Sequence, residues 1–447
     1  MKIIIVGAGK VGYSLAQRLV QDNHDVYVIE KNEERANALQ NTLDVNIVPG
    51  SGSNMALLHE IGTEDTGMLI AVTDSDEVNM LACSVAKLSG IPRTIARVRD
   101  NESWGPENLL MREALGVDLF INPEMVTAQE ILQILQTPAA LDVEDFANGM
   151  VRLMEIKVRN EHDIVGRTLK DITLPEGVLV VGILRSGEMI IPHGNSVILM
   201  EDNVFFLGAR EGISEIEHWF QESKRQMNRI VIIGAGLIGQ NLAVLLEKEG
   251  FTVKVIEKRM DRCEKLASMV ENTIVICGDG TDVDLLEAEE VGENDAIICL
   301  TDDDKLNLLV ALLGKHIGIE KSFVRVGRPE YISLMEQVGV DVVFSPRLLT
   351  SGKILRLVRS EENLVTVSSF EGSKAEAIEI ELRENTPVIG KALKDVTLPG
   401  TSLVGAVVRN NESIIPTGAT KLFAGDHIVI FTLPQFVSDV LSYLQSK

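Results

Sequence analysis

Short apolar runs alternate with stretches of helical periodicity over the first hundred residues of the chain. The pattern predicts strands at Ile3–Val6, Asp25–Ile29, Val45–Val48, Met68–Val72 and Thr94–Val98, separated by helices at Gly12–Gln21, Glu33–Leu43, Asn54–Ile61 and Val78–Leu88. Short apolar strands that alternate with amphipathic helices are typical of a parallel sheet covered on both faces. The same series recurs from Ile230 to Val326.

The repeat extends to individual residues. The sequence IIIVGAGKVG at positions 3–12 returns as IVIIGAGLIG at 230–239, an offset of 227 (234 − 7). Each copy closes on a short strand followed by a proline, Pro123 or Pro346, and a predicted helix, 124–135 or 347–358.

After these helices the pattern changes to short strands and turns, again in two copies. Ile164–Pro175 matches Val388–Pro399 at an offset of 224 (399 − 175). Each copy spans roughly 80 residues, which is small for an independent core, so we expect these modules to pack against a neighbour. The predicted fold class is α/β: two Rossmann-like doubly wound parallel-sheet domains, each followed by a small α+β module. The expected domains are 1–138, 139–225, 226–360 and 361–447.

Each copy of the repeat carries Gly-x-Gly-x-x-Gly directly after an apolar strand, as in dinucleotide-binding sites. Gly7 allows the tight turn, Gly9 lets a pyrophosphate approach the backbone, and Gly12 lets helix and sheet pack closely. The N–H groups of Ala8, Lys10 and Val11 are candidates for phosphate binding at the positive end of the helix. The corresponding candidates in the second copy are Gly234, Ala235, Gly236, Leu237, Ile238 and Gly239.

An acidic residue ends the next predicted strand in both copies. Glu30 lies 21 residues after Gly9 (30 − 9), and Glu257 lies 21 residues after Gly236 (257 − 236). A carboxylate here accepts hydrogen bonds from a ribose diol and repels a 2′-phosphate, which favours NAD(H) over NADP(H). Tight βα packing without a ligand is the alternative, and we expect such packing to require neither carboxylate.

Further candidates follow the third, fourth and fifth strands, at the sheet edge where doubly wound folds hold ligands. They are Ser51, Thr73, Asp74 and Arg97 in the first copy, and Asp279, Thr301, Asp302 and Arg325 in the second. The acidic runs 74–77 and 302–304 indicate helix capping more than a metal site. Arg97 and Arg325 are interpreted either as phosphate ligands or as partners in surface ion pairs.

Composition and the missing motifs narrow the function. The formal charge of −24 disfavours nucleic acid and anionic membrane surfaces as partners. The chain contains no run of 18 apolar residues, so no membrane span is predicted. Its four cysteines lack C-x-x-C spacing, which is typical of a reduced cytoplasmic protein. We find no nucleophile elbow, Walker lysine motif or metal-ligand cluster, and His162, His193 and His427 do not repeat between the small modules. Binding without catalysis is therefore the prediction: no catalytic residue and no metal.

The chain resembles the TrkA family over essentially its whole length. The resemblance rests on the tandem glycine motifs, each followed by its acidic residue, Thr-Asp pair and arginine. A module with the pattern Gly-x-x-Leu-x-Asp-Ile/Val-x-Leu-Pro then follows each copy. This family comprises the NAD-binding regulatory subunits of bacterial Trk potassium uptake systems. The resemblance implies regulator-of-potassium-conductance (RCK) domains that bind NAD(H) and ATP or ADP. It also implies a cytoplasmic ring, a homotetramer, docked peripherally on an inner-membrane potassium-translocating subunit of the TrkH or TrkG type.

The two copies differ where Gly-Ser-Gly-Ser (50–53) stands in place of Gly-Asp-Gly-Thr (278–281), so Ser51 lacks the carboxylate of Asp279. We therefore expect the two sites to differ in affinity or nucleotide choice. Two alternatives remain: an NAD-dependent oxidoreductase of unknown substrate, and a structural scaffold with degenerate sites.

Overall fold

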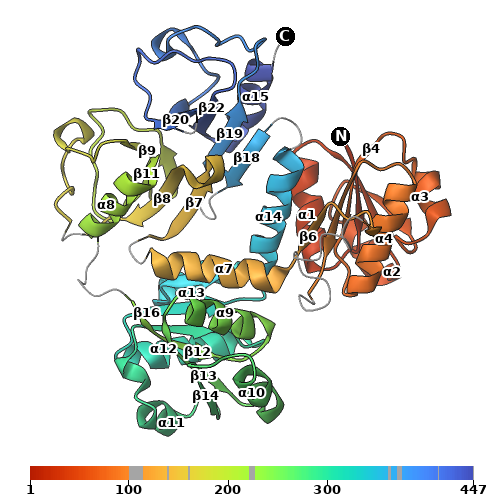
Figure 1. Ribbon diagram of the computed structural model, residues 1–447, viewed down its shortest axis with the longest axis vertical. Coiled ribbons are helices and arrows are strands. Elements are labelled where there is room, and N and C mark those ends of the chain that lie inside the picture. The colour runs from red at the N-terminus through yellow and green to blue at the C-terminus, as the bar shows by residue number, and fades with distance from the viewer. Residues whose placement is uncertain are drawn as a thin grey trace. The chain divides into compact units, whose positions relative to one another are not determined.

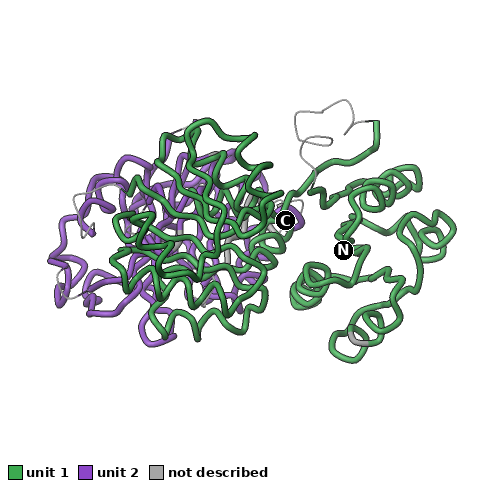
Figure 2. Tube along the Cα trace, turned by 90° about the horizontal axis from the view of Figure 1, so that it is seen from below, with its two compact units in different colours: residues 1–132, 227–355 green, residues 133–226, 356–447 purple. Residues whose placement is uncertain are grey.

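A computed structural model describes residues 1–99, 114–137, 140–159, 162–220, 227–360, 364–369, 375–410 and 412–445. The chain forms two compact units, each discontinuous in sequence (Figure 2). Residues 1–132 and 227–355 make up unit 1, and residues 133–226 and 356–447 make up unit 2. Unit 1 therefore combines the two glycine-motif segments, and unit 2 combines the two small modules.

The first segment of unit 1 contains a six-stranded sheet, all parallel, in the spatial order β3-β2-β1-β4-β5-β6. The strands are Lys2–Val6 (β1), Asp25–Glu30 (β2), Asn46–Pro49 (β3), Thr66–Ala71 (β4), Arg93–Arg97 (β5) and Leu119–Ile121 (β6). The helices are Lys10–Gln21 (α1), Glu33–Gln40 (α2), Met55–Ile61 (α3), Asp76–Leu88 (α4) and Pro123–Gln136 (α7) (Figure 1). This strand order is that of a dinucleotide-binding fold, and it reverses between β1 and β4.

The second segment repeats this sheet in the order β14-β13-β12-β15-β16-β17, again all parallel. Its strands are Arg229–Ile233 (β12), Thr252–Glu257 (β13), Ile274–Cys277 (β14), Ala296–Cys299 (β15), Lys321–Arg325 (β16) and Val342–Phe344 (β17). Its helices are Leu237–Lys248 (α9), Met260–Ala267 (α10), Val283–Ala288 (α11), Asp304–His316 (α12), Ile332–Val338 (α13) and Pro346–Ser360 (α14). The central strands β1 and β12 are buried along almost their full length because helices cover both faces.

Unit 2 contains two antiparallel five-stranded sheets of matching order, β10-β9-β11-β8-β7 and β21-β20-β22-β19-β18. The first module consists of Asp142–Phe146 (β7), Val151–Lys157 (β8), Val178–Arg185 (β9), Glu188–Ile190 (β10), Asn203–Ala209 (β11) and Arg210–Phe220 (α8). The second consists of Leu364–Ser369 (β18), Glu376–Glu381 (β19), Ser402–Arg409 (β20), Glu412–Ile414 (β21), His427–Thr432 (β22) and Val437–Gln445 (α15).

The two modules of unit 2 share one apolar core. Phe205 of β11 and Phe431 of β22 are fully buried against each other, with ring centroids 5.6 Å apart. The buried carboxylate of Glu379 accepts a hydrogen bond from the Ala147 N–H of the other module at 3.0 Å and contacts His427 at 3.2 Å. The expectation that these small modules pack against a neighbour is thus met by their packing against each other.

An ion pair between a partly exposed arginine and a buried aspartate recurs in each module. Arg185 holds Asp202 through two hydrogen bonds of 2.8 and 2.7 Å, and Arg409 holds Asp426 through two of 2.7 Å. Both aspartates are almost completely buried, so the paired geometry satisfies charges that would otherwise be costly to bury.

The predicted fold class is confirmed by these sheets. One predicted helix is shorter than expected: the helix expected to continue to Leu43 ends at Gln40. Asn41 is the carboxyl-terminal cap residue, and the Thr42 hydroxyl donates to the Leu39 carbonyl oxygen in the last turn of the helix.

Candidate nucleotide-binding sites

The first glycine turn follows β1, at the point where the strand order reverses. Gly7 has φ +103°, and a Cβ atom on it would lie 3.1 to 3.2 Å from Thr73 of the neighbouring loop. A Cβ on Gly12 would lie 1.9 Å from the Gly7 carbonyl oxygen, so no other residue fits there. A Cβ on Gly9, by contrast, would meet no atom within 4 Å. Gly7 and Gly12 are therefore required by the fold, whereas the space at Gly9 is open.

The second turn has the same geometry. Gly234 has φ +103°, a Cβ on Gly239 would lie 2.1 Å from the Gly234 carbonyl oxygen, and a Cβ on Gly236 would meet nothing within 4 Å. The first bond within each following helix runs from Tyr13 N to Gly9 O, or from Gln240 N to Gly236 O, at 2.9 Å in both. The N–H groups at the next three positions lie ahead of that bond, at the positive end of the helix. They belong to Lys10, Val11 and Gly12, and to Leu237, Ile238 and Gly239.

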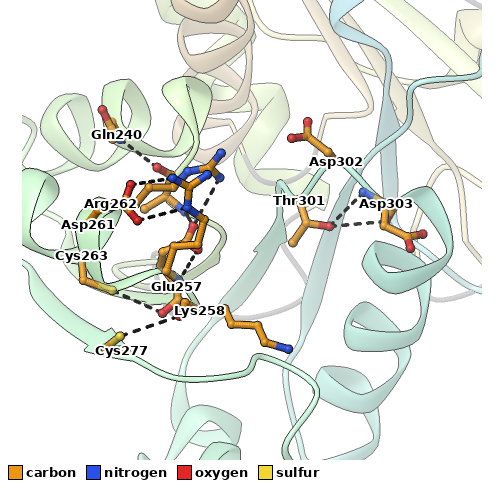
Figure 3. A network of polar contacts seen from close by, with 12 residues as sticks. Gln240, Glu257, Lys258, Asp261, Arg262, Cys263, Cys277, Thr301, Asp302 and Asp303 are labelled. Carbon is orange, nitrogen blue, oxygen red and sulfur yellow. Dashed lines mark hydrogen bonds and ion pairs between the residues drawn. The ribbon is translucent and has the colours of Figure 1, made fainter.

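The acidic residue of each copy holds the glycine turn in place. Glu30, 5% exposed, accepts hydrogen bonds from Ala8 N at 2.6 Å and Asn32 N at 2.8 Å. Glu257, 6% exposed, accepts from Ala235 N and Arg259 N, both at 2.8 Å, and lies 3.8 Å from the Arg262 guanidinium (Figure 3). Each carboxylate thus has a packing contact with the glycine turn that the sequence analysis did not expect. It also follows that the Ala8 and Ala235 N–H groups, expected to face a phosphate, are engaged by these carboxylates. That packing requires neither carboxylate stays a prediction.

A buried asparagine organises the opposite side of each site. Asn79 accepts hydrogen bonds from the backbone N and the hydroxyl of Thr73, at 2.8 and 2.7 Å, and donates to the carbonyl oxygens of Thr73 and Arg97. Asn307 makes the same four contacts with Thr301 and Arg325. Both asparagines are completely buried. The sequence analysis missed both asparagines. Each lies six residues after its threonine, and the two are separated by 228 residues (307 − 79), as are the two threonines.

The acidic runs after the fourth strands act as helix caps. Ser75 caps α4, and Asp303 caps α12 by accepting from Lys305 N and Leu306 N. Asp76 and Asp304 accept from Arg99 N and Gly327 N, at 2.8 and 2.7 Å. Within the described residues no group of three or more potential metal ligands is found.

The two predicted phosphate arginines differ in their surroundings. Arg325 donates to the carbonyl oxygen of Thr301 at 2.7 Å and to the exposed carboxylate of Asp302 at 2.8 Å. Arg97 lies 3.9 Å from Asp74, and its side chain is 11% exposed. The buried Nε of Arg97 has no hydrogen-bond partner among the described residues, and the same holds for the Nε of Arg325. Burial lowers the pKa of the Arg97 guanidinium, and the nearby charge of Arg99 lowers it further.

A cavity of about 350 Å³ within unit 1 lies beside the first glycine turn, and its wall also includes Ile238 and Arg325 of the second copy. Its wall includes Gly9 and Val11 and six cationic side chains, against two acidic ones, Asp74 and Glu124. The cations are Lys10, Arg35, Arg97, Arg99, Arg325 and Arg347. Arg347, in α14 of the second segment, donates to the hydroxyl of Ser14 at 2.6 Å, and so reaches the first site from a distant part of the chain. An excess of positive charge beside a glycine turn and a helix N-terminus suits a polyphosphate.

The second site has a different charge pattern. Leu237 and Gly327 occupy the positions that correspond to Lys10 and Arg99. Asp279 binds Lys258 at 2.9 Å and accepts two hydrogen bonds from Thr281. The bond with Lys258 is the main cause, and those with Thr281 the next, that lower the pKa of Asp279 to about 2. In the first copy, the Ser51 hydroxyl is instead 2.8 Å from the Ser53 hydroxyl. Two positions that are cationic at the first site, Lys10 and Arg99, are therefore uncharged at the second.

The sequence profile of the TrkA-N domain matches residues 3–123 and 230–346, and that of the TrkA-C domain matches 153–221 and 377–445. The chain belongs to the TrkA family. It is 38% identical over 453 residues to "Trk system potassium uptake protein TrkA homolog 1" of Methanosarcina mazei, covering 100% of both chains. It is 37% identical over 454 residues to "Trk system potassium uptake protein TrkA" of Vibrio alginolyticus, covering 100% of this chain and 99% of the relative.

The fold is shared with solved structures of GsuK. The crystal structure of the GsuK RCK domain superposes with a TM-score of 0.64 at 19% identity, covering 100% of this chain and 95% of that one. The GsuK channel bound to NAD gives the same TM-score and identity, covering 79% of the channel chain. The resemblance to the TrkA family is thus confirmed, and RCK-type domains are confirmed as the fold.

The prediction that the chain is not an enzyme agrees with its family, whose members are named as potassium uptake proteins. The described residues contain no helix long and apolar enough to cross a bilayer.

Proposed function

We propose that this chain is the nucleotide-binding regulatory subunit of a Trk-type potassium uptake system, controlling a membrane potassium-translocating subunit of the TrkH or TrkG type. In this proposal the chain lies in the cytoplasm, peripherally on the inner membrane through that partner. Membership of the TrkA family supports the transport role. The observation that carries the regulatory role is the duplicated glycine turn, open at Gly9 and Gly236 and held by a buried carboxylate.

NAD(H) is the proposed ligand of both sites. Glu30 and Glu257 end the strand that faces the adenosine ribose in this fold, and each oxygen of a carboxylate accepts more than one hydrogen bond. Their negative charge opposes a 2′-phosphate, so NADP(H) is the disfavoured cofactor. GsuK, which shares the fold, has been solved as a channel bound to NAD.

ATP or ADP is the proposed alternative ligand of the first site. The terminal phosphates of these nucleotides carry more charge than the pyrophosphate of NAD, and the wall of the first cavity has four more cations than acids. Arg97 and Arg325, each with a buried Nε that has no hydrogen-bond partner among the described residues, both belong to this wall. The second site, with Leu237 and Gly327 at the matching positions, is proposed to favour NAD(H).

A ring of several copies, a homotetramer, is the proposed assembly. Leu81 on α4 and Leu309 on α12 are 54% and 51% exposed, and they occupy corresponding positions in the two segments of unit 1. Large apolar side chains exposed at equivalent positions suit contacts between copies. A nucleotide that binds one arrangement of such a ring better than another shifts its population and so changes the surface offered to the membrane partner.

Calorimetric titration of the purified full chain with NADH, NADPH and ATP tests the nucleotide part of this proposal. We expect NADH to bind more tightly than NADPH, and the double variant Gly9→Ala, Gly236→Ala to bind neither NADH nor ATP. Its matched control is Gly352→Ala in α14, outside both turns, where φ is not positive and a Cβ meets nothing within 4 Å. Absence of NADH and ATP binding to the unmodified chain would contradict the proposal.

A further inference from the structure

Two cysteines lie together at the carboxyl end of β13, beside the carboxylate proposed to bind ribose in the second site. Cys263 in α10 donates from its Sγ to the Glu257 carbonyl oxygen at 3.3 Å. Cys277 ends β14, directly opposite Glu257 in the strand register, and its Sγ lies 3.9 Å from the Lys258 carbonyl oxygen. Figure 3 shows both side chains directed at this short stretch of backbone. The two thiols therefore approach the same two residues from a helix and from a neighbouring strand.

The two thiols also differ in access to solvent. Burial raises the pKa of Cys263 to about 12, and a hydrogen bond with the Cys277 thiol is the next cause. Cys263 is 6% exposed, whereas Cys277 is exposed. An exposed thiol next to a buried one is the arrangement in which the first reacts with an oxidant and the second resolves the product as a disulfide.

The pair is confined to the second segment. The corresponding positions in the first segment are Ala36 and Pro49, so the first site provides an internal comparison without thiols. The other two cysteines, Cys83 and Cys299, are fully buried, and burial raises the pKa of each thiol.

We propose that Cys263 and Cys277 form a peroxide-sensitive dithiol that couples the redox state of the chain to nucleotide binding at its second site. The Cys277 thiolate attacks one oxygen of the peroxide, the O–O bond breaks, and the leaving oxygen takes up a proton, so that Cys277 becomes a sulfenic acid. The Cys263 sulfur, losing its proton, then attacks the Cys277 sulfur and displaces hydroxide, which leaves as water. The two thiols together lose two electrons and two protons, and the peroxide is reduced to water and an alcohol, or to two waters for hydrogen peroxide.

The coupling follows from what the disulfide removes and what it joins. Oxidation abolishes the Sγ–H donor to the Glu257 carbonyl oxygen and ties α10 to β14 on either side of Glu257. The Glu257 carboxylate holds both Ala235 N of the glycine turn and Arg259 N, so a shift of this residue disturbs the turn. The disulfide thus disfavours nucleotide binding, and by linkage the nucleotide disfavours the disulfide. This coupling, unlike the dithiol itself, rests on the proposed nucleotide site.

Disulfide mapping tests the dithiol without any nucleotide. The reduced full chain is treated with hydrogen peroxide, free thiols are alkylated, and peptides are identified by mass spectrometry. We expect a Cys263–Cys277 disulfide that a thiol reductant reverses, and none in Cys263→Ala or Cys277→Ser, with the control Cys83→Ala behaving as the unmodified chain. Oxidation of Cys277 alone to sulfinic acid, with Cys263 still free, would overturn the proposal.

NADH titration of the Gly9→Ala variant, which isolates the second site, tests the coupling. We expect the oxidised form to bind NADH about fivefold or more weakly than the reduced form, a ratio within the usual range of coupling between sites. Adding Cys263→Ala is expected to remove the difference. Equal affinities of the two forms would overturn the coupling. Failure of the reduced form to bind NADH would instead refute the proposed function of this site, while the mapping still decides the dithiol.

Discussion

Replacement of Glu257 by alanine separates the two roles assigned to this carboxylate. In the unliganded chain Glu257 accepts hydrogen bonds from Ala235 N and Arg259 N, and Ala235 is completely buried. A hydrogen bond to a charged group contributes about 1.5 to 3 kcal/mol, and a buried N–H left without a partner costs about 1 to 3 kcal/mol. Because Arg259 N is only partly buried and can bond to water, we expect Glu257→Ala to lower the free energy of unfolding by about 2 to 4 kcal/mol.

The effect on ligand binding is expected in addition to this loss of stability. The variant loses the acceptors for the ribose hydroxyls and the turn geometry together, so the Kd for NADH at the second site rises about tenfold or more, equivalent to 1.4 kcal/mol per factor of ten. Glu257→Gln keeps an acceptor oxygen but removes the charge. We expect it to retain more stability while losing much of the preference for NADH over NADPH.

Chemical denaturation and calorimetric titration of these variants, each combined with Gly9→Ala to silence the first site, provide the assay. Glu30→Ala, combined with Gly236→Ala, is the matched control at the first site, where Ala8 N takes the place of Ala235 N. Unchanged stability and unchanged NADH affinity in Glu257→Ala would refute the reasoning. A loss of stability with no loss of NADH affinity in the folded protein would leave Glu257 as a purely structural residue.

Three further predictions concern the glycine turn, the cationic cavity and Asp279. Gly12→Ala places a Cβ 1.9 Å from the Gly7 carbonyl oxygen and is expected to destabilise the fold severely. Gly9→Ala is expected to keep the unfolding temperature of the unmodified chain and to lose nucleotide binding. Equal unfolding temperatures of the two variants would contradict this prediction. Arg97→Ala is expected to weaken ATP binding about tenfold or more and to reduce the salt dependence of that binding. A smaller effect is expected for Arg325→Ala, because the Arg325 side chain is already bound to Asp302. Equal losses of ATP affinity in the two variants, titrated at two salt concentrations, would count against this prediction. Asp279, whose folded pKa is lowered to about 2 from 3.8, stabilises the fold above about pH 4 and loses this contribution as the pH falls through 2. Asp279→Asn should therefore lower the melting temperature slightly at pH 6 and not at pH 2, because an exposed pair contributes only about 0–1 kcal/mol; the same difference at both values would exclude the ion pair as its cause.

The sequence predicted the elements whose physical signal is local. Buried strands read as apolar runs, and the roles of Gly7 and Gly12 followed from the spacing of the motif, because the steric requirement lies within a single turn. Glu30 was located correctly at the end of its strand, yet its bond to Ala8 N was missed. That bond joins residues 22 apart and depends on how two strands lie side by side.

The remaining features depend on contacts that no local pattern encodes. Asn79 reads as an ordinary polar residue in a helix, and only its four contacts with Thr73 and Arg97 set it apart. Arg347 reaches the first cavity by folding of a segment more than 300 residues away in sequence, as its bond with Ser14 shows. Comparison of the two copies makes both residues visible: Asn79 recurs as Asn307, whereas Arg347 stands where the first copy has Glu124.

Rubidium uptake, as a tracer for potassium, tests the central claim most directly. The assay uses cells that lack their own Trk regulatory subunit and other potassium uptake systems and that carry the matching translocating subunit. Expression of the unmodified chain is predicted to restore uptake, whereas the stably folded double variant Gly9→Ala, Gly236→Ala is predicted to restore it less. Uptake that stays at the level of the empty cells with the unmodified chain, or that is restored equally by the double variant, would contradict nucleotide-controlled potassium uptake.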